Sequence, residues 1–347
     1  MPKLMKPLTL GAAALATFGL VFAQFGTPSA WADGGQADVD ATAAQIADAA
    51  PASAPVEAPT VTGDQATAQA DGTTASVPLD PAQPITLTDT GSTDTVNPSF
   101  TISMPKELQA GKGQKAKNGT MVYRSSQKTG AHGAVQVHAD GSVSLDTVID
   151  SARGATRFTY TIGNATPVLQ ADGSVNLVQT TSQNGVTVEA TVATIAAPWA
   201  KDAKGNPVAT HFQVIGNKLV QVIQATGKTA YPVVADPYVK AIWHWWGISV
   251  YYSKAFTRSL NNSWLLNGTS ALGGLACGAL TASTLGIGAV ACAAGSWVFG
   301  THLSNVVSHA AATGGCVRLD IPYFPSAISM IVASVAHEDH TSSCQAS

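Results

Sequence analysis

The residues with the greatest chemical capacity form a group of histidines and carboxylates near the C-terminus. Residues 337–340 read His-Glu-Asp-His, which gathers four potential ligands but is not the H-E-x-x-H pattern of a zinc-binding helix. We interpret it as a solvated segment. His302 and His309 are seven residues apart, on one face of a predicted helix, where they could titrate at mildly acidic pH. We interpret both as polar side chains on an apolar helix.

The rest of the sequence lacks the signatures of familiar enzymes. Asp146 and Asp150 have i, i+4 spacing, with no nearby histidine to suggest acid–base catalysis. Lys112, Lys115 and Lys117 form a basic loop, which we interpret as a solvated turn and not as a polyanion site. The sequence holds no G-x-S-x-G, phosphate-binding loop or dinucleotide fingerprint. It therefore predicts a non-enzymatic protein with no catalytic or metal site, no cofactor and no nucleic-acid partner.

Four cysteines, Cys277, Cys292, Cys316 and Cys344, fall in the last 71 residues, with 14, 23 and 27 residues between them. These spacings lack the C-x-x-C pairs of a zinc site. An even, clustered set in an exported protein predicts two disulfides, for which three pairings exist. If the segment around Cys277 and Cys292 is an antiparallel hairpin, those two face each other and Cys316 pairs with Cys344.

Residues 1–32 have the organisation of a secretory signal. Lys3 and Lys6 precede an apolar run, and Ala30-Trp31-Ala32 supplies the small residues of a cleavage site before Asp33. An uncleaved single-pass anchor is the alternative. The sequence thus predicts cleavage between Ala32 and Asp33 and a secreted or cell-envelope location.

Charge is scarce and unevenly distributed. Charged residues are 11% of the chain, against about 25% in typical domains. Residues 33–95 hold ten acids and no lysine or arginine, whereas residues 237–319 hold four cations and no acid. Residues 33–95 also contain few large apolar side chains, so we expect a disordered acidic linker. The alternative over residues 41–50 is an Ala-rich helix, which would be marginal alone. The cationic, hydrophobic end suggests a surface that faces a membrane or a partner.

Residues 96–236 alternate apolar and polar side chains in short runs rich in Val, Thr, Ile and Tyr. Asp140-Gly141, Asp172-Gly173 and Gly216-Asn217 separate runs as hairpin turns do. We expect an antiparallel β-sandwich or half-barrel domain here. With the C-terminal segment it makes an α+β protein.

Residues 237–347 form the second predicted module. Pro237 begins it, and a helix capped by Ser253 leads into two apolar arms, 263–282 and 289–312. We expect a helical hairpin, with Gly274 and Gly278 in a G-x-x-x-G that allows close helix packing. A strand at 317–324 and a short helix at 325–340 complete the module. The hairpin is either buried core or an element that enters a membrane or docks on a partner.

An aromatic group stands at the start of this module. Its members are Trp243, Trp245, Trp246, Tyr251 and Tyr252. Because Trp and Tyr favour interfaces between apolar and wet surroundings, we interpret the group as a belt at a membrane or partner interface.

Residues 197–237, which end in "YPVVADP", resemble a recurrent piece of uncharacterised secreted proteins of actinobacteria. The order of parts is also similar, with a signal peptide, a spacer, a β-region and a hydrophobic tail that contains cysteines. The resemblance implies localisation and architecture and no activity. A weaker similarity is to bacteriocin precursors, from which this chain departs by its long leader and its lack of a double-glycine export motif.

The function hypothesis from the sequence is a secreted, bacteriocin-like precursor whose C-terminal hydrophobic module interacts with membranes. The alternative is a cell-envelope structural or adhesion protein in which the hairpin is buried core. The former expects processing near Pro237, and the latter expects an intact chain.

Overall fold

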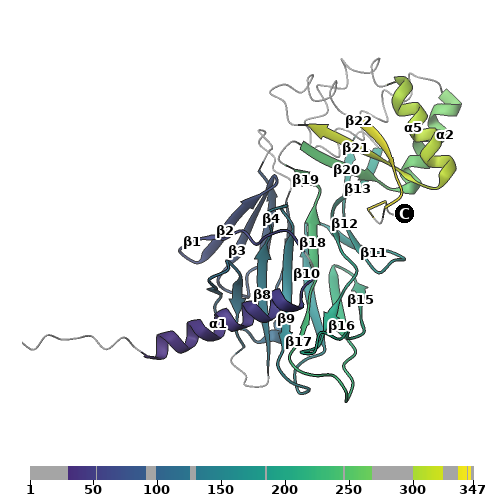
Figure 1. Ribbon diagram of the computed structural model, residues 1–347. Helices are drawn as coiled ribbons and strands as arrows, with labels where there is room; N and C mark the ends of the chain where they lie inside the picture. Colours follow the sequence, from purple (N-terminus) through teal and green to yellow (C-terminus); the bar gives the residue numbers. More distant parts are fainter. Residues whose placement is uncertain are drawn as a thin grey trace, which may run out of the picture.

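The computed structural model describes residues 30–51, 53–90, 99–125, 130–183, 186–244, 247–267, 300–322, 335–341 and 343–344. Nearly half of these residues belong to antiparallel β-strands, which form two sheets (Figure 1). The antiparallel β-rich fold expected from the sequence is confirmed.

The first sheet has eight strands in the order β1-β2-β3-β4-β5-β10-β16-β15. Its first five strands follow each other along the chain, and β10 then joins them to the hairpin of β15 and β16. The strands are β1 (Thr60–Thr62), β2 (Gln65–Ala70), β3 (Thr73–Pro78), β4 (Ile85–Asp89), β5 (Ser99–Ile102), β10 (Arg157–Gly163), β15 (Thr210–Ile215) and β16 (Lys218–Ile223).

The second sheet has fourteen strands, with the main order β22-β21-β20-β13-β18-β9-β8-β7-β6. Strands β11, β12, β14, β17 and β19 pair beside this path. The strands are β6 (Gln114–Lys115), β7 (Met121–Tyr123), β8 (Ala131–Val137), β9 (Val143–Ile149), β11 (Thr166–Leu169), β12 (Val175–Gln183), β13 (Val186–Ile195), β14 (Ala200–Lys201), β17 (Val233–Ala235), β18 (Tyr238–Ala241), β19 (Trp243–His244), β20 (Gly247–Tyr252), β21 (Cys316–Pro322) and β22 (Val335–Asp339).

One hydrophobic core joins the two sheets. Strand β10 buries Phe158, Tyr160 and Ile162 on one face and turns polar side chains outward, as the two-residue period of a strand requires. Phe100 of the first sheet packs on Trp243 of the second, with ring centroids 5.7 Å apart. Large aromatic side chains therefore fill the space between the sheets.

Strand β9 is buried on both faces, since all seven of its residues are buried. Its inner face, with Leu145, contributes to the core shared by the sheets. Its outer face, with Val148, is covered by helix α1 (Ala30–Ala49), which crosses the sheet there (Figure 1). The buried apolar side chains of α1 include Val39, Ala43 and Ile46.

The predicted turns at Asp140-Gly141 and Asp172-Gly173 exist, but they are longer than two-residue hairpin loops. Residues 138–142 connect β8 to β9, and residues 170–174 connect β11 to β12. In each turn the glycine has the positive φ, +75° at Gly141 and +85° at Gly173, and the aspartate accepts a hydrogen bond from the serine N–H two residues on. The sequence located the turns and missed their length.

The expectation of a disordered linker at 33–95 is wrong over the described residues of that segment. They form α1 and strands β1 to β4, and β1 to β4 make half of the first sheet. The physical reason is that small apolar residues are sufficient where they alternate: Ala66 and Ala75 are fully buried, as are Ile85 and Leu87 of the next strand. Two ion pairs, Asp38–Arg124 at 2.8 Å and Asp40–Lys117 at 3.1 Å, also join α1 to the second sheet.

The predicted domain boundary at residues 236 and 237 is also wrong. Strands β17 and β18 flank it, and both pair with β9. The Pro237 carbonyl accepts a hydrogen bond from the Leu145 N–H at 2.9 Å. The chain therefore stays in one sheet as it passes the proline, because the residues on either side continue the same antiparallel register.

The docking of α1 gives a first prediction. Ile46→Ala should lower the free energy of unfolding by about 2–5 kcal/mol, because it removes a fully buried side chain and leaves a cavity. Urea denaturation measures the change. Gln45→Ala, at an exposed neighbouring position of the same helix, should change stability by less than about 0.5 kcal/mol. Equal small effects of both substitutions would contradict the docking of α1.

Candidate functional site

The strongest candidate for a functional site is the C-terminal module, defined as β20, β21 and β22 with the helices α2 (Lys254–Asn267) and α5 (Gly300–Thr313). The three strands continue the second sheet beyond β13, and the helices lie side by side next to them (Figure 1). The predicted helical hairpin falls largely on residues 268–299, which lie outside the described residues.

Helix α2 begins where the sequence predicts. The Ser253 hydroxyl oxygen accepts a hydrogen bond from the Phe256 N–H at 3.0 Å, the geometry of an N-cap. One turn later, the Thr257 hydroxyl oxygen accepts a hydrogen bond from the Val317 N–H at 3.1 Å. The second bond joins α2 to β21. It lies inside the core, since Thr257 is fully buried.

Both helices bury apolar residues against the strands. Leu260 of α2 and Ala310 of α5 join the main core with Val317 and Leu319 of β21. The helices also meet each other, since the Ser308 hydroxyl donates a hydrogen bond to the Asn261 side-chain oxygen at 3.0 Å. The two ends of the undescribed segment 268–299 are therefore held by the same body.

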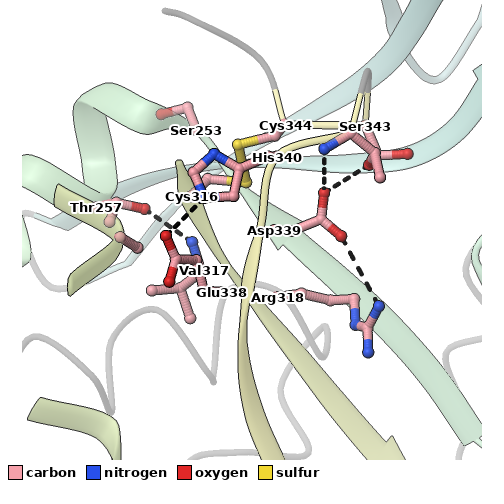
Figure 2. Close-up of a disulfide and its surroundings, with 12 residues drawn as sticks. Ser253, Thr257, Cys316, Val317, Arg318, Glu338, Asp339, His340, Ser343 and Cys344 are labelled. Atoms are coloured by element: carbon pink, nitrogen blue, oxygen red, sulfur yellow. Dashed lines mark hydrogen bonds and ion pairs between the residues drawn. A yellow bond between two sulfur atoms is a disulfide. The ribbon is translucent and has the colours of Figure 1, made fainter. Parts of the chain in front are cut away.

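A disulfide closes the module. Cys316, at the start of β21, is bonded to Cys344, with their Cα atoms 5.6 Å apart (Figure 2). Both cysteines are buried, and the nearby Ser343 carbonyl accepts a hydrogen bond from the Thr191 hydroxyl of β13 at 3.2 Å. The Cys316–Cys344 pairing is confirmed. Cys277 and Cys292 lie outside the described residues.

The acidic side chains of β21 and β22 are already engaged by neighbours. Glu338 interacts with His309, Thr313 and His340, and these hydrogen bonds, led by that of Thr313, lower the pKa of Glu338 to about 2. Asp320 accepts the Ser249 hydroxyl at 2.7 Å.

Arg318 links two of these strands by charge. It lies 3.0 Å from Asp320 and 3.7 Å from Asp339, and His337 contacts Asp320 at 3.3 Å from the same side. Among the described residues, no group of three or more His, Cys, Asp and Glu side chains is placed to hold a metal ion. The acids and histidines of the predicted solvated segment instead fasten β22 to its surroundings.

The C-terminal helix expected at 325–340 is wrong in its described part, since residues 335–339 form strand β22, which pairs with β21. Tertiary pairing overrides local propensity here. The strand expected at 317–324 is confirmed by β21 over its described residues.

The aromatic group does not form one exposed belt. Trp243 is 2% exposed and Tyr252 is 4% exposed, because both belong to the main core. Tyr251 is partly buried against the same core. The interface interpretation is therefore wrong for Trp243 and Tyr252. Trp245, Trp246, Gly274 and Gly278 lie outside the residues whose side chains the structure describes.

The predicted cleavage site, Ala32 and Asp33, falls within the first turn of α1, and its processing stays a prediction. In the part of the chain that the structure describes, no helix is both long and apolar enough to cross a membrane.

The sequence analysis did not predict the burial of two sets of polar side chains. Asp146 and Asp236 are 1% and 2% exposed, in the middle of the second sheet. His138 hydrogen-bonds to Ser144 at 2.8 Å through Nε2 and to the Ala54 carbonyl at 2.9 Å through Nδ1. The available signal was an ionisable residue inside an otherwise apolar strand, as in "VVADP", but its pairing required knowledge of the sheet register.

Comparisons of the chain with protein-family models, with curated proteins and with solved structures find no match. The functional argument therefore depends on the geometry of the chain itself.

The disulfide gives the second prediction. Replacing both cysteines, Cys316→Ala with Cys344→Ala, should lower the free energy of unfolding by about 3–4 kcal/mol in the chain-entropy model, because the bond closes a loop of 28 residues. Denaturation with and without reductant measures it. Reductant should lower the free energy of unfolding of the wild-type chain. The loss caused by reductant should be smaller in the variant by about 3–4 kcal/mol, because the variant lacks this bond. A variant as stable as the oxidised wild type would contradict the role of the bond.

Proposed function

We propose that this chain is an exported, non-enzymatic protein of the cell envelope, with a structural or adhesive role, that works as one intact body. The observation that carries the proposal is the continuity of the sheet through Pro237. Strand β18 pairs with both β9 and β13, and β20 pairs with β13. The C-terminal module is thus a continuation of the β framework.

This continuity argues against a precursor that releases its C-terminal part. Release of a fragment that begins near Pro237 would separate β18 and β20 from β9 and β13, with which they pair. Strands β21 and β22 would leave with β20. The release would leave unpaired backbone groups along β9 and β13, and such exposed edges promote aggregation. It would also cut beside Asp236, a buried position. An intact chain is the arrangement that the packing favours.

Support for a non-catalytic role comes from the polar groups of the module. Glu338, Asp320 and Asp339 each interact with side chains or backbone of their own module. Support for the envelope comes from the predicted signal segment and from a disulfide at the end of the framework, since such bonds persist in oxidising compartments.

A second candidate function is membrane contact, and one observation favours it. Residues 268–299 contain no charged residue, and the helices before and after them are fastened to each other by the bond between Ser308 and Asn261. A segment of that composition, held at both ends by one framework, could contact lipid while the rest of the chain remains folded.

The third prediction concerns the exported chain. It should be recovered uncut across Pro237, as shown by intact mass, and should cosediment with isolated cell walls. The same preparation of the exported chain is mixed with isolated cell walls and, separately, with liposomes that contain anionic lipid. Recovery of a fragment that begins near Pro237, or a chain that binds neither target, would contradict the proposed function.

A matched pair of variants separates the two candidates. Leu275→Lys adds a charge to the uncharged segment, and Ile215→Lys adds the same charge at a strand end that is 59% exposed. Membrane contact through residues 268–299 predicts that only Leu275→Lys reduces liposome binding, by at least about tenfold, because lysine is costly in an apolar phase. The envelope function predicts wall binding by the wild type and by Ile215→Lys, without liposome binding.

A further inference from the structure

Two buried acids face each other across neighbouring strands of the second sheet. Strand β17 pairs with β9 through Ala235 and Thr147, and β18 resumes the same register at Tyr238 and Ser144. Between these pairs, the register places Asp236 directly opposite Asp146. The Leu145 N–H, which bonds to the Pro237 carbonyl at 2.9 Å, shows that the ladder continues through this point.

The two carboxyl groups have little to compensate them. Asp236 accepts a hydrogen bond from the Trp199 N–H at 3.3 Å, and one oxygen of Asp146 has no hydrogen-bond partner. Neither carboxyl forms an ion pair among the described residues. Two like charges that are buried side by side cannot both be ionised without a large loss of stability. At least one proton therefore belongs to the folded state of this pair.

The pKa values follow this geometry. Burial is the largest cause that raises the pKa of Asp236, to about 7, and hydrogen bonds from Trp199 partly oppose it. Burial also raises the pKa of Asp146 well above its ordinary value, and the charge of Asp236 raises it further.

The other ionisable groups around the pair have partners of their own. Tyr160, from the opposite sheet, is fully buried and hydrogen-bonded to Thr147, and Lys201 lies over the Trp199 ring. The ion pairs on the elements that pack around this face are Asp38–Arg124, Asp40–Lys117, His132–Asp150 and Lys240–Asp140.

The N-terminal part of the chain covers the face on which both acids lie. Side chains alternate along a strand, so Asp146 shares its face with Val148, and Asp236 shares its face with Val234. Both valines pack against α1. We call α1 together with residues 53–57 the N-terminal cover.

Residues 53–57 are fastened to the end of β8. The Glu57 N–H donates to the Val137 carbonyl at 2.8 Å, and the Ala139 N–H donates to the Pro55 carbonyl at 2.8 Å. His138 adds its side-chain bond to the Ala54 carbonyl. The cover is thus held over the acid pair at both of its ends, by α1 and by this short segment.

We propose that the proton held by Asp146 and Asp236 is a latch for the N-terminal cover, so that the cover docks firmly in acid and loosens as the pH rises. The cover is the element that moves because it packs on one face of the sheet, whereas β9, β17 and β18 are held by ladders on both sides. Lifting the cover lets water reach the carboxylates and removes the cost of their ionisation.

The sign of the effect follows from linkage. Folding raises the pKa of Asp236 from 3.8 to about 7. Between pH 3.8 and about pH 7, Asp236 therefore keeps its proton when the cover is docked and loses it when the cover is lifted. Its contribution to docking is fully present below about pH 4 and is lost as the pH rises through about 7. Asp146 acts in the same direction.

His138 acts in the opposite direction. Burial lowers its pKa from 6.5, so the folded chain favours the neutral ring. Its contribution is present above about pH 6.5 and is lost as the pH falls through the lowered pKa. The acid latch must therefore be measured against a variant that keeps His138 and lacks the two titrating carboxyls.

Amide hydrogen exchange of the full exported chain tests the latch. The readout is the opening constant of α1, obtained by dividing the observed exchange rate by the intrinsic rate at each pH. In the wild type, relative to Asp146→Asn/Asp236→Asn, this constant should rise by up to about tenfold per pH unit between about pH 5 and pH 7. The double variant mimics the protonated pair and should stay closed at about pH 8.

The control is Asp80→Asn, which removes one negative charge at an exposed position and should behave as the wild type. If the double variant does not fold, the single variant Asp146→Asn should still reduce the pH dependence. A wild-type opening constant that does not rise between about pH 5 and pH 7 relative to the double variant, or a pH dependence that survives in the folded Asn variants, would overturn the proposal. Equal loosening of α1 and of the β15–β16 hairpin would overturn it too, since the latch acts on the cover.

Discussion

The burial of strand β9 on both faces is the constraint on which the rest of the structure depends. A strand with two hidden faces needs a second sheet on one side and a separate cover on the other. Phe158 and Tyr160 of β10 help to supply the first, and α1 supplies the second. Without the N-terminal segment, Val148 and Val234 would lie bare on an open sheet. The acidic segment is therefore a structural part of the sandwich.

The same strand explains why the C-terminal module cannot be treated as a separate domain. Strand β9 pairs with β17 and β18, and β18 leads through β13 to β20 and the module. Each step is a backbone ladder, so the disulfide at Cys316 and the helices α2 and α5 are connected to the centre of the sheet without a linker. The Trp243 and Tyr252 side chains fill this connection, and their burial explains aromatic residues that otherwise indicate an interface.

Local patterns in the sequence predicted local structure well. Alternating apolar and polar runs predicted most strands in residues 96–236. Ser253 predicted the start of a helix, and the cysteine positions were compatible with the Cys316–Cys344 bond. These signals work because a strand face, a cap and a covalent bond depend on a few neighbouring residues. The failures concern long-range packing and pairing. Ala66 and Ala75 look like linker residues until their sheet packs into the core that it shares with the second sheet, and residues 335–339 look helical until β21 pairs with them.

The candidate site was less predictable for the same reason. Asp146 was noticed for its spacing to Asp150, but its partner is Asp236, ninety residues away in the chain. Only the register of β9 with β17 and β18 brings the two acids together. His138 and Ser144 are similar, because their role depends on Ala54, which belongs to a segment with no apparent structural signal. The lack of acidic residues in residues 237–319 suggested a surface that faces a partner. Composition alone could not distinguish such a surface from residues that lack charge because they are buried in the core.

The central claim is that the acidic N-terminal segment is folded onto the sheets, and zero-length carbodiimide coupling tests it most directly. This reagent joins a carboxylate to a lysine that already touches it. The account predicts selective coupling of Asp40 to Lys117 and of Asp64 to Lys112, whose charged atoms lie 3.1 and 2.6 Å apart. Asp140 and Lys240, 3.1 Å apart in the β framework, provide the internal standard. The account would be contradicted if the ten acids in residues 33–95 coupled to the lysines without preference while Asp140 and Lys240 coupled selectively.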